Sequence, residues 1–206
     1  MLQNRSTMVP RKGVFILFFQ SFLDVNSSHF QMEIDSEIGK STPNPTNPTR
    51  EQILRHLHRA NQVAKRAYQF GHHPFGSILI GPDHETELIA QGNIDAVNHA
   101  ESTLARIACT NFSSDYLWTC TLYSTFEPCV MCAGTIYWSN IGRVVYGVEE
   151  KRLLQLTGDS KDNPTMNIPC RYVFEHGQKN IQVLGPVPEL ETALMEPHKG
   201  FWKKTV

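Results

Sequence analysis

The sequence predicts a layered α/β domain in which a largely parallel sheet follows an initial two-stranded hairpin. Two patterns support this prediction. Apolar runs of strand length alternate with segments of helical periodicity over residues 49–206. The first two runs are separated by a Gly-Pro-Asp turn at residues 81–83, which is typical of a hairpin. The chain of 206 residues is long enough for one such domain and an extension.

The first half of the domain is predicted as helix, hairpin and helix. Residues 36–49 are rich in Ser, Thr, Asn and Pro and are predicted to form a linker. Thr49 then caps a helix whose apolar residues recur at helical spacing to about Phe70. Strands are expected at 77–80 and 88–91. A second helix is expected over 99–109, with Asn98 as its N-cap.

The second half alternates strands and helices. A helix is predicted from Pro128 to Trp138, with Pro128 in the first helical position because its missing N–H costs nothing there. Residues 157–169 carry Gly, Asp, Asn and Pro throughout and are expected to form a loop. The other expected elements are strands at 121–124, 144–146 and 181–184, and helices at 149–156 and 188–202.

Residues 1–48 are predicted to be an N-terminal extension that precedes the domain of residues 49–206. Arg11-Lys12 followed by an apolar stretch near residues 13–23 has the pattern of a signal peptide. The stretch is too short to span a bilayer, and no clear cleavage site follows it. Two interpretations stay open: a secretory signal, or a start codon assigned too early, with Met32 as the true beginning.

The composition of the chain indicates which classes of binding partner and which cellular compartment to expect. The net charge of −1 gives no basic excess of the kind that binding to a phosphate backbone requires. One segment is locally basic, with the cations Arg50, Arg55, Arg59, Lys65 and Arg66. A solvated helix face is the simpler interpretation of this segment, and a basic binding face is the alternative. The five cysteines have no disulfide-framework spacing, so we expect a cytosolic protein.

A histidine, a glutamate and two cysteines form the motif that carries chemistry. His99-Ala100-Glu101 precedes Pro128-Cys129-Val130-Met131-Cys132. Imidazole and thiolate are ligands that Zn²⁺ prefers, and a zinc site with three protein ligands keeps a fourth position for water. The sequence therefore predicts a catalytic zinc site with ligands His99, Cys129 and Cys132. Glu101 is predicted to move the protons during hydrolysis.

A closed zinc site is the competing interpretation of the same motif. A Cys-x-x-Cys pair also occurs in structural zinc sites and in redox sites. Cys170 or His176 would supply the fourth ligand of a structural site. A non-catalytic, zinc-stabilised binding module is therefore the alternative of another class.

The stretch from Ser124 to Ile136, together with the His-x-Glu motif, resembles the cytidine deaminase-like superfamily. Within it, the branch of tRNA adenosine deaminases and guanine deaminases is most similar, and residues 50–150 carry the resemblance. The resemblance implies a three-layer fold with a five-stranded mixed sheet between helices, one zinc per subunit, and a homodimer formed through the region after the Pro-Cys helix. It also implies that Asn93 contacts the base and that Phe75 lines its pocket.

The substrate is expected to be a small-molecule base or nucleoside, and a guanine-like purine is preferred. The lack of a basic excess and the aromatic C-terminal end favour it. Trp202 or Phe201 is predicted to cover the site as a lid, the alternative being an anchor for the last helix. Ile141–Gly147 looks like the tRNA-editing enzymes, so wobble adenosine in tRNA is the alternative substrate. Cytosine also stays open, because the zinc chemistry is the same. No membrane partner is expected.

Overall fold

The computed structural model describes residues 47–158, 161 and 163–202. Its helices are α2 (Arg50–Gln69), α3 (Ala100–Asn111), α4 (Ser114–Thr119), α5 (Val130–Trp138), α6 (Glu150–Thr157), α7 (Cys170–Glu175) and α8 (Glu191–Met195). Its strands are β1 (Gly76–Ile80), β2 (Glu87–Gly92), β3 (Thr121–Phe126), β4 (Arg143–Val148) and β5 (Gln182–Leu184). Two 3-10 turns, η1 (Pro188–Leu190) and η2 (Glu196–His198), flank α8.

The strands form one mixed sheet in the order β2-β1-β3-β4-β5. Strand β1 is antiparallel to both neighbours, so that Ser77 lies opposite Gln91 on one side and Ser124 on the other. The pairs β3–β4 and β4–β5 are parallel. The predicted α/β class, the hairpin and the parallel second half are thus confirmed. Ligand sites of such sheets lie beyond the carboxyl ends of the parallel strands, which here are the ends of β3 and β4.

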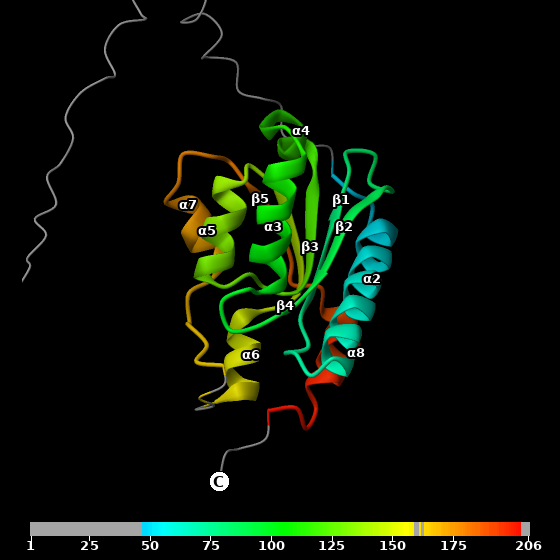
Figure 1. Cartoon of the computed structure of the whole chain (residues 1–206), viewed down its shortest axis with the longest axis vertical. Coiled ribbons are helices and arrows are strands. Elements are labelled where there is room, and N and C mark those ends of the chain that lie inside the picture. The colour runs from blue at the N-terminus through cyan, green and yellow to red at the C-terminus, as the bar shows by residue number, and fades with distance from the viewer. Residues whose placement is uncertain (1–46, 159–160, 162, 203–206) are drawn as a thin grey trace, which may run out of the picture. The chain divides into compact units, whose positions relative to one another are not determined.

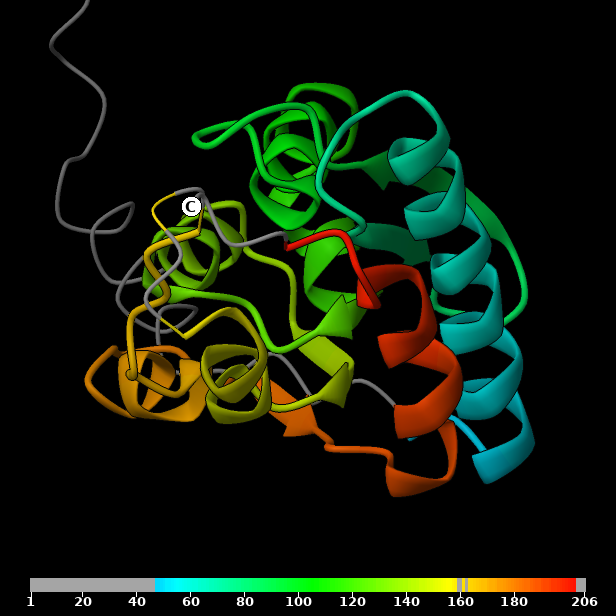
Figure 2. The same cartoon turned by 90° about the horizontal axis from the view of Figure 1, so that it is seen from below.

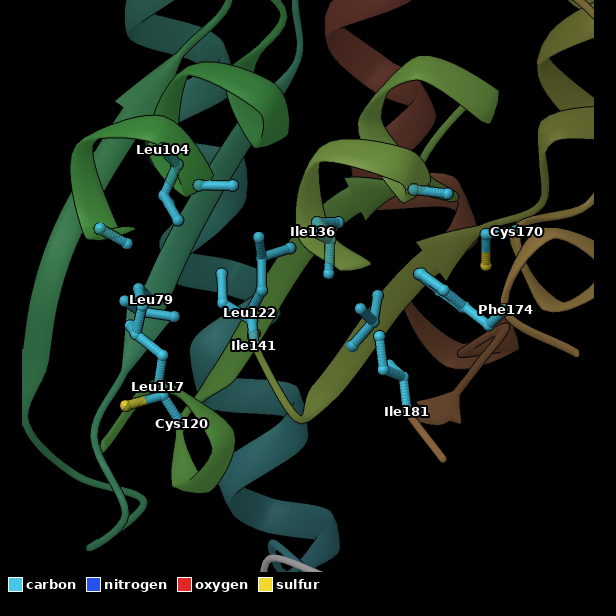
Figure 3. Close-up of a cluster of buried hydrophobic side chains, with 14 of the residues drawn as sticks. Leu79, Leu104, Leu117, Cys120, Leu122, Ile136, Ile141, Cys170, Phe174 and Ile181 are labelled. Carbon is cyan, nitrogen blue, oxygen red and sulfur yellow. The ribbon is translucent and has the colours of Figure 1, made fainter. Parts of the chain in front are cut away.

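Helices cover both faces of the sheet, which confirms the three layers (Figure 1). Helices α3 and α5 lie over one face, and α2 and α8 over the other (Figure 1). The core on the α3–α5 side interleaves Leu79 and Leu122 of the sheet with Leu104 of α3 and Ile136 of α5 (Figure 3). All four are fully buried, and each contributes about 1.5–3 kcal/mol of burial free energy. This packing fixes the starts of α3 and α5 relative to the end of β3.

Helix α2 confirms the prediction of its start and explains the basic segment. The Thr49 hydroxyl accepts the Gln52 N–H at 3.2 Å, and the Gln52 side chain accepts the Thr49 N–H at 2.8 Å, which is a capping box. Four of the five cations of the segment are paired with carboxylates. The pairs are Arg50–Glu189, Arg55–Glu85, Arg59–Glu87 and Lys65–Glu196. The segment is therefore a charge-balanced helix face.

Three expectations were wrong or incomplete. The short helices α4 and α7 were not expected, because six residues carry too little periodicity to detect. The closing helix predicted over 188–202 is broken into η1, α8 and η2. Pro197 explains the break after Met195, since it lacks the N–H that a continuing helix would use.

The proposed extension at residues 1–46, with its apolar stretch and Met32, lies outside the described residues. Among the residues that are described, no helix is long and apolar enough to cross a membrane. All five cysteines of the sequence fall within this part, and each is a free thiol.

Candidate active site

Two helix starts deliver the predicted metal ligands. His99 is the N-cap of α3 and Cys129 is the N-cap of α5. Neither side chain caps its own helix, so both remain available to a ligand. The expected N-cap Asn98 was wrong, because its side chain bonds to Asp95 at 2.9 Å instead. Pro128 also lies one residue before the N-cap and not inside α5.

The three predicted ligands meet at one point. The Nδ1 atom of His99 lies 3.6 Å from the sulfur of Cys129 and 3.6 Å from that of Cys132. All three ligand atoms lie within 4.8 Å of one another. Tetrahedral zinc, with Zn–S and Zn–N bonds of about 2.3 and 2.0 Å, separates sulfur from nitrogen by roughly 3.5 Å. The cluster therefore fits a zinc ion.

The charge of the thiol pair also fits a cation. A hydrogen bond from Cys132 lowers the pKa of Cys129 to about 4, with His99 assisting. The same bond, together with burial, raises the pKa of Cys132 well above its usual value. Without a cation the two sulfurs therefore hold a single negative charge. A divalent ion removes the second proton, as metals do from coordinating thiols.

Glu101 lies beside the cluster, on the first turn of α3. One carboxylate oxygen is 3.6 Å from the sulfur of Cys132, and the other accepts a hydrogen bond from the Ser124 hydroxyl at 2.7 Å. The residue is only 5% exposed, and burial raises the pKa of its carboxyl. A carboxyl group that is fixed beside the metal cluster and readily protonated is suited to take and return protons.

A small cavity of about 30 Å³ adjoins Glu101. Phe75, Phe126 and Leu153 form its apolar walls. Its polar walls are Asn93, Glu101, Glu127, Glu150 and Asn163, and the ligands His99 and Cys129 close it. This volume holds about two water molecules, so the wall must move to admit a ring. The site is therefore a small, partly open pocket with the Glu101 carboxyl buried in its wall.

A layer of aromatic rings lies behind the apolar wall. His198 is buried, with its ring centre 4.5 Å from Phe126 and 5.0 Å from Phe75. Trp202 donates its indole N–H to Nδ1 of His198 at 3.1 Å, and its ring lies 6.1 Å from that of Phe75. The red C-terminal segment that carries them follows α8, which lies beside α2 (Figure 2).

The structure thus gathers most of the predicted site residues and adds others. Asn93 and Phe75 lie on the cavity wall, whereas Trp202 packs behind Phe75 and does not line the cavity. Cys170 and His176 do not belong to the metal cluster. Sequence reasoning missed Ser124, although alternation along β3 places it on the face of the buried Leu122. It also missed Glu127 and Glu150.

Comparison with known proteins gives a consistent family. Residues 50–148 match the family model described as the cytidine and deoxycytidylate deaminase zinc-binding region. A probable cytosine deaminase of Schizosaccharomyces pombe is 36% identical over 74% of this chain and 93% of its own length. A guanine deaminase of Bacillus subtilis is 38% identical over 37% of this chain and 51% of its own length.

A solved structure from work on tRNA:A34 deaminases, which edit the wobble position of transfer RNA, is also similar. It has 26% sequence identity and a TM-score of 0.51, and it covers 68% of this chain and 97% of the other. These relatives are named for different bases, namely cytosine, guanine and the wobble adenosine of tRNA.

Proposed function

This chain belongs to the cytidine and deoxycytidylate deaminase family of zinc-dependent hydrolases, and we propose that its substrate is a free guanine-like purine base. The single observation that carries the proposal is the enclosure of the reacting groups. Glu101 and Asn93 are 5% and 3% exposed, in a cavity with aromatic walls. A nucleotide inside an RNA chain needs an opening for the backbone on both sides, whereas a free base needs none.

The surface charge supports a small molecule over tRNA. The basic segment of α2 is balanced by the carboxylates of Glu85, Glu87, Glu189 and Glu196. Affinity for RNA grows with the number of phosphates that free cations neutralise. This helix face therefore offers little attraction to an anticodon arm.

The reaction exchanges the amino group of the ring for oxygen and releases ammonia. Zinc held by His99, Cys129 and Cys132 would lower the pKa of water toward neutrality. Glu101 would carry a first proton from the attacking water to the ring nitrogen, and then a second proton, from the hydroxyl added to the ring, to the amine that leaves as ammonia. Ser124 holds the Glu101 carboxylate in position through its hydrogen bond. Phe75 and Phe126 provide apolar faces between which a planar ring packs.

Cytosine is the second candidate substrate. The Schizosaccharomyces pombe relative, a probable cytosine deaminase, matches over nearly its whole length. The small cavity also favours a single ring. Wobble adenosine in tRNA is supported by the likeness to the tRNA:A34 deaminase structure, and the same experiment tests it.

An ammonia-release assay over guanine, adenine, cytosine, their nucleosides and an anticodon stem-loop RNA tests the proposal. We expect kcat/KM for guanine to exceed that for every other substrate. Preferred turnover of cytosine or of the stem-loop would overturn the choice of substrate while leaving the family unchanged.

We also propose that the protein is a homodimer through the surface that follows α5. Trp138, the last residue of α5, is 81% exposed, and Tyr172 of α7 is also exposed. Large exposed aromatic side chains are typical of protein interfaces. Sedimentation analysis of the wild type and of Trp138→Ala tests this proposal. We expect a dimer that the substitution weakens, and a monomeric wild type would contradict it.

A further inference from the structure

Glu150 is a buried carboxyl in the cavity that the proposed mechanism does not use. It is the first residue of α6, is 5% exposed, and lines the same cavity as Glu101 and Asn93. Burial, followed by the nearby negative charges of Cys129 and Glu101, raises the pKa of the Glu150 carboxyl to about 8. A carboxyl in such a place is costly unless something binds it.

In the described part of the chain no residue donates a hydrogen bond to the Glu150 carboxyl, and the causes of its raised pKa are burial and nearby charges alone. Glu127 in the same wall differs, because its two oxygens accept the backbone N–H groups of Cys170 at 2.9 Å and Glu150 at 3.1 Å. Buried polar groups in folded proteins are nearly always hydrogen-bonded. The unpaired carboxyl of Glu150 therefore marks a position for a donor that comes from outside the chain.

The backbone that carries Glu150 is held in place. The carboxylate of Glu127 ties the start of α6 to the start of α7 through the two bonds just given. Leu153, one turn later, packs in the core between the sheet and α2. Bonds from charged acceptors to N–H groups at helix starts are among the stronger ones in proteins. The position of Glu150 is therefore fixed before a ligand arrives.

Asn93 offers a second unpaired acceptor to the same cavity. Its Nδ2 donates to the carbonyl of Asp95 at 3.0 Å, which fixes the orientation of the amide. Its Oδ1 is buried and has no hydrogen-bond partner. Asn93 follows β2 and Glu150 begins α6, so the two acceptors come from separate elements.

We propose that Glu150 binds a ring N–H of the substrate and, with Asn93, makes the site select bases that carry two ring N–H groups. This inference rests on the proposed function. Besides the amino group that is removed, guanine carries an N–H on each of its two rings. Adenine and cytosine each carry one. With either of those bases, one of these two acceptors would stay unpaired, which is unfavourable.

The proposed role of Glu150 in binding the base can be tested separately from a structural role at the start of α6. A carboxylate at a helix start stabilises the helix through its dipole. Glu149, the N-cap of α6, holds an equivalent position and is exposed. Glu149→Gln is thus a matched control for Glu150→Gln, since both replace a carboxyl group with an amide at the same helix start.

The experiment compares kcat/KM for guanine, cytosine and adenine in the wild type, Glu150→Gln and Glu149→Gln, with zinc content and Tm measured for each. We expect Glu150→Gln to lower kcat/KM for guanine about tenfold to hundredfold, the range for leaving a buried hydrogen-bonding group without its partner. Its effect on the other bases should be smaller, and its zinc content and Tm should equal those of Glu149→Gln.

Two results separate this inference from the proposed function. If the wild type turns over guanine and Glu150→Gln matches Glu149→Gln, the role of Glu150 is overturned and the proposed function stands. If the wild type does not turn over guanine, the proposed function fails and with it the selection for two N–H groups. The contact by Glu150 is then judged on the base that is accepted, where a tenfold loss supports it and an unchanged rate overturns it.

Discussion

The predicted zinc ligands and the proposed proton shuttle, Glu101, come from two short stretches, residues 99–101 and 129–132, at the starts of α3 and α5. The walls that face the base come from segments spread over residues 75–163. A motif confined to two helix starts determines the type of reaction. The cavity wall, in contrast, comes from several separate segments, and each segment can change without the others. Relatives that are named as guanine, probable cytosine and tRNA:A34 deaminases fit this difference.

Removal of a ligand should have the largest effect. Cys132→Ser replaces a buried thiolate with a hydroxyl that binds zinc poorly, so we expect loss of zinc and activity below detection. Metal analysis and ammonia release check this outcome. Cys109→Ser is the control, because Cys109 is an exposed thiol on the same helix as Glu101 and should keep both zinc and activity.

Glu101→Gln separates catalysis from metal binding. We expect kcat to fall about 10²- to 10⁴-fold, the contribution typical of a positioned acid–base group, while zinc stays bound. Metal analysis and steady-state kinetics on the same preparation measure both quantities. Equal activity in the variant and the wild type would assign proton transfer to another group. Loss of zinc would show that Glu101 is a ligand.

The site of His99, Glu101, Cys129 and Cys132 could be predicted from the sequence because these residues lie in two short motifs whose spacing is typical of a zinc site. Both helix starts were nonetheless misplaced, since His99 and Cys129 are themselves the N-caps and neither has the side chain that a cap usually provides. Glu127 and Glu150 could not be found in this way. A carboxylate at the start of a predicted helix looks solvated in the sequence. Only the folded structure buries these two residues, where Glu127 accepts N–H groups from the starts of α6 and α7.

Ser124→Ala tests whether a hydroxyl group from strand β3 helps to position the Glu101 carboxylate. The hydroxyl donates to Glu101 at 2.7 Å, so its loss should lower kcat about tenfold and leave KM nearly unchanged. Ser77→Ala is a matched control. Ser77 is the cross-strand partner of Ser124, is equally buried, and its hydroxyl has no bond to lose. Equal losses in the two variants would attribute the effect to packing alone.

Truncation before Gly200 tests whether the aromatic layer behind the cavity wall affects binding of the substrate. It removes Trp202, which packs on Phe75 and donates to His198, so KM should rise by up to about tenfold with a smaller change in kcat. A chain that ends at Trp202 is the control, because it keeps every described residue of the segment. Unchanged kinetics in a stable truncated protein would show that the aromatic layer does not shape the site.

His198 should make the free energy of unfolding of the protein depend on pH. Burial, with a smaller effect of nearby His73, lowers the pKa of His198 to about 3, whereas an unfolded histidine has a pKa of about 6.5. Below pH 6.5 the unfolded chain therefore binds a proton that the folded chain does not, and folding is weakened as the pH falls from 6.5 toward 3. Above pH 6.5 the residue has no such effect.

The measurement compares the free energy of unfolding at pH 7.5 and pH 5.5 in the wild type and in His198→Phe. The wild type should lose about 1 kcal/mol more than the variant between these two values. The difference between the proteins isolates His198, because the zinc ligands titrate in both. Equal losses would mean that the imidazole is protonated in the folded state. The aromatic layer would then be open to water, and the enclosure that favours a free base over RNA would be weaker than the burial of Glu101 and Asn93 indicates.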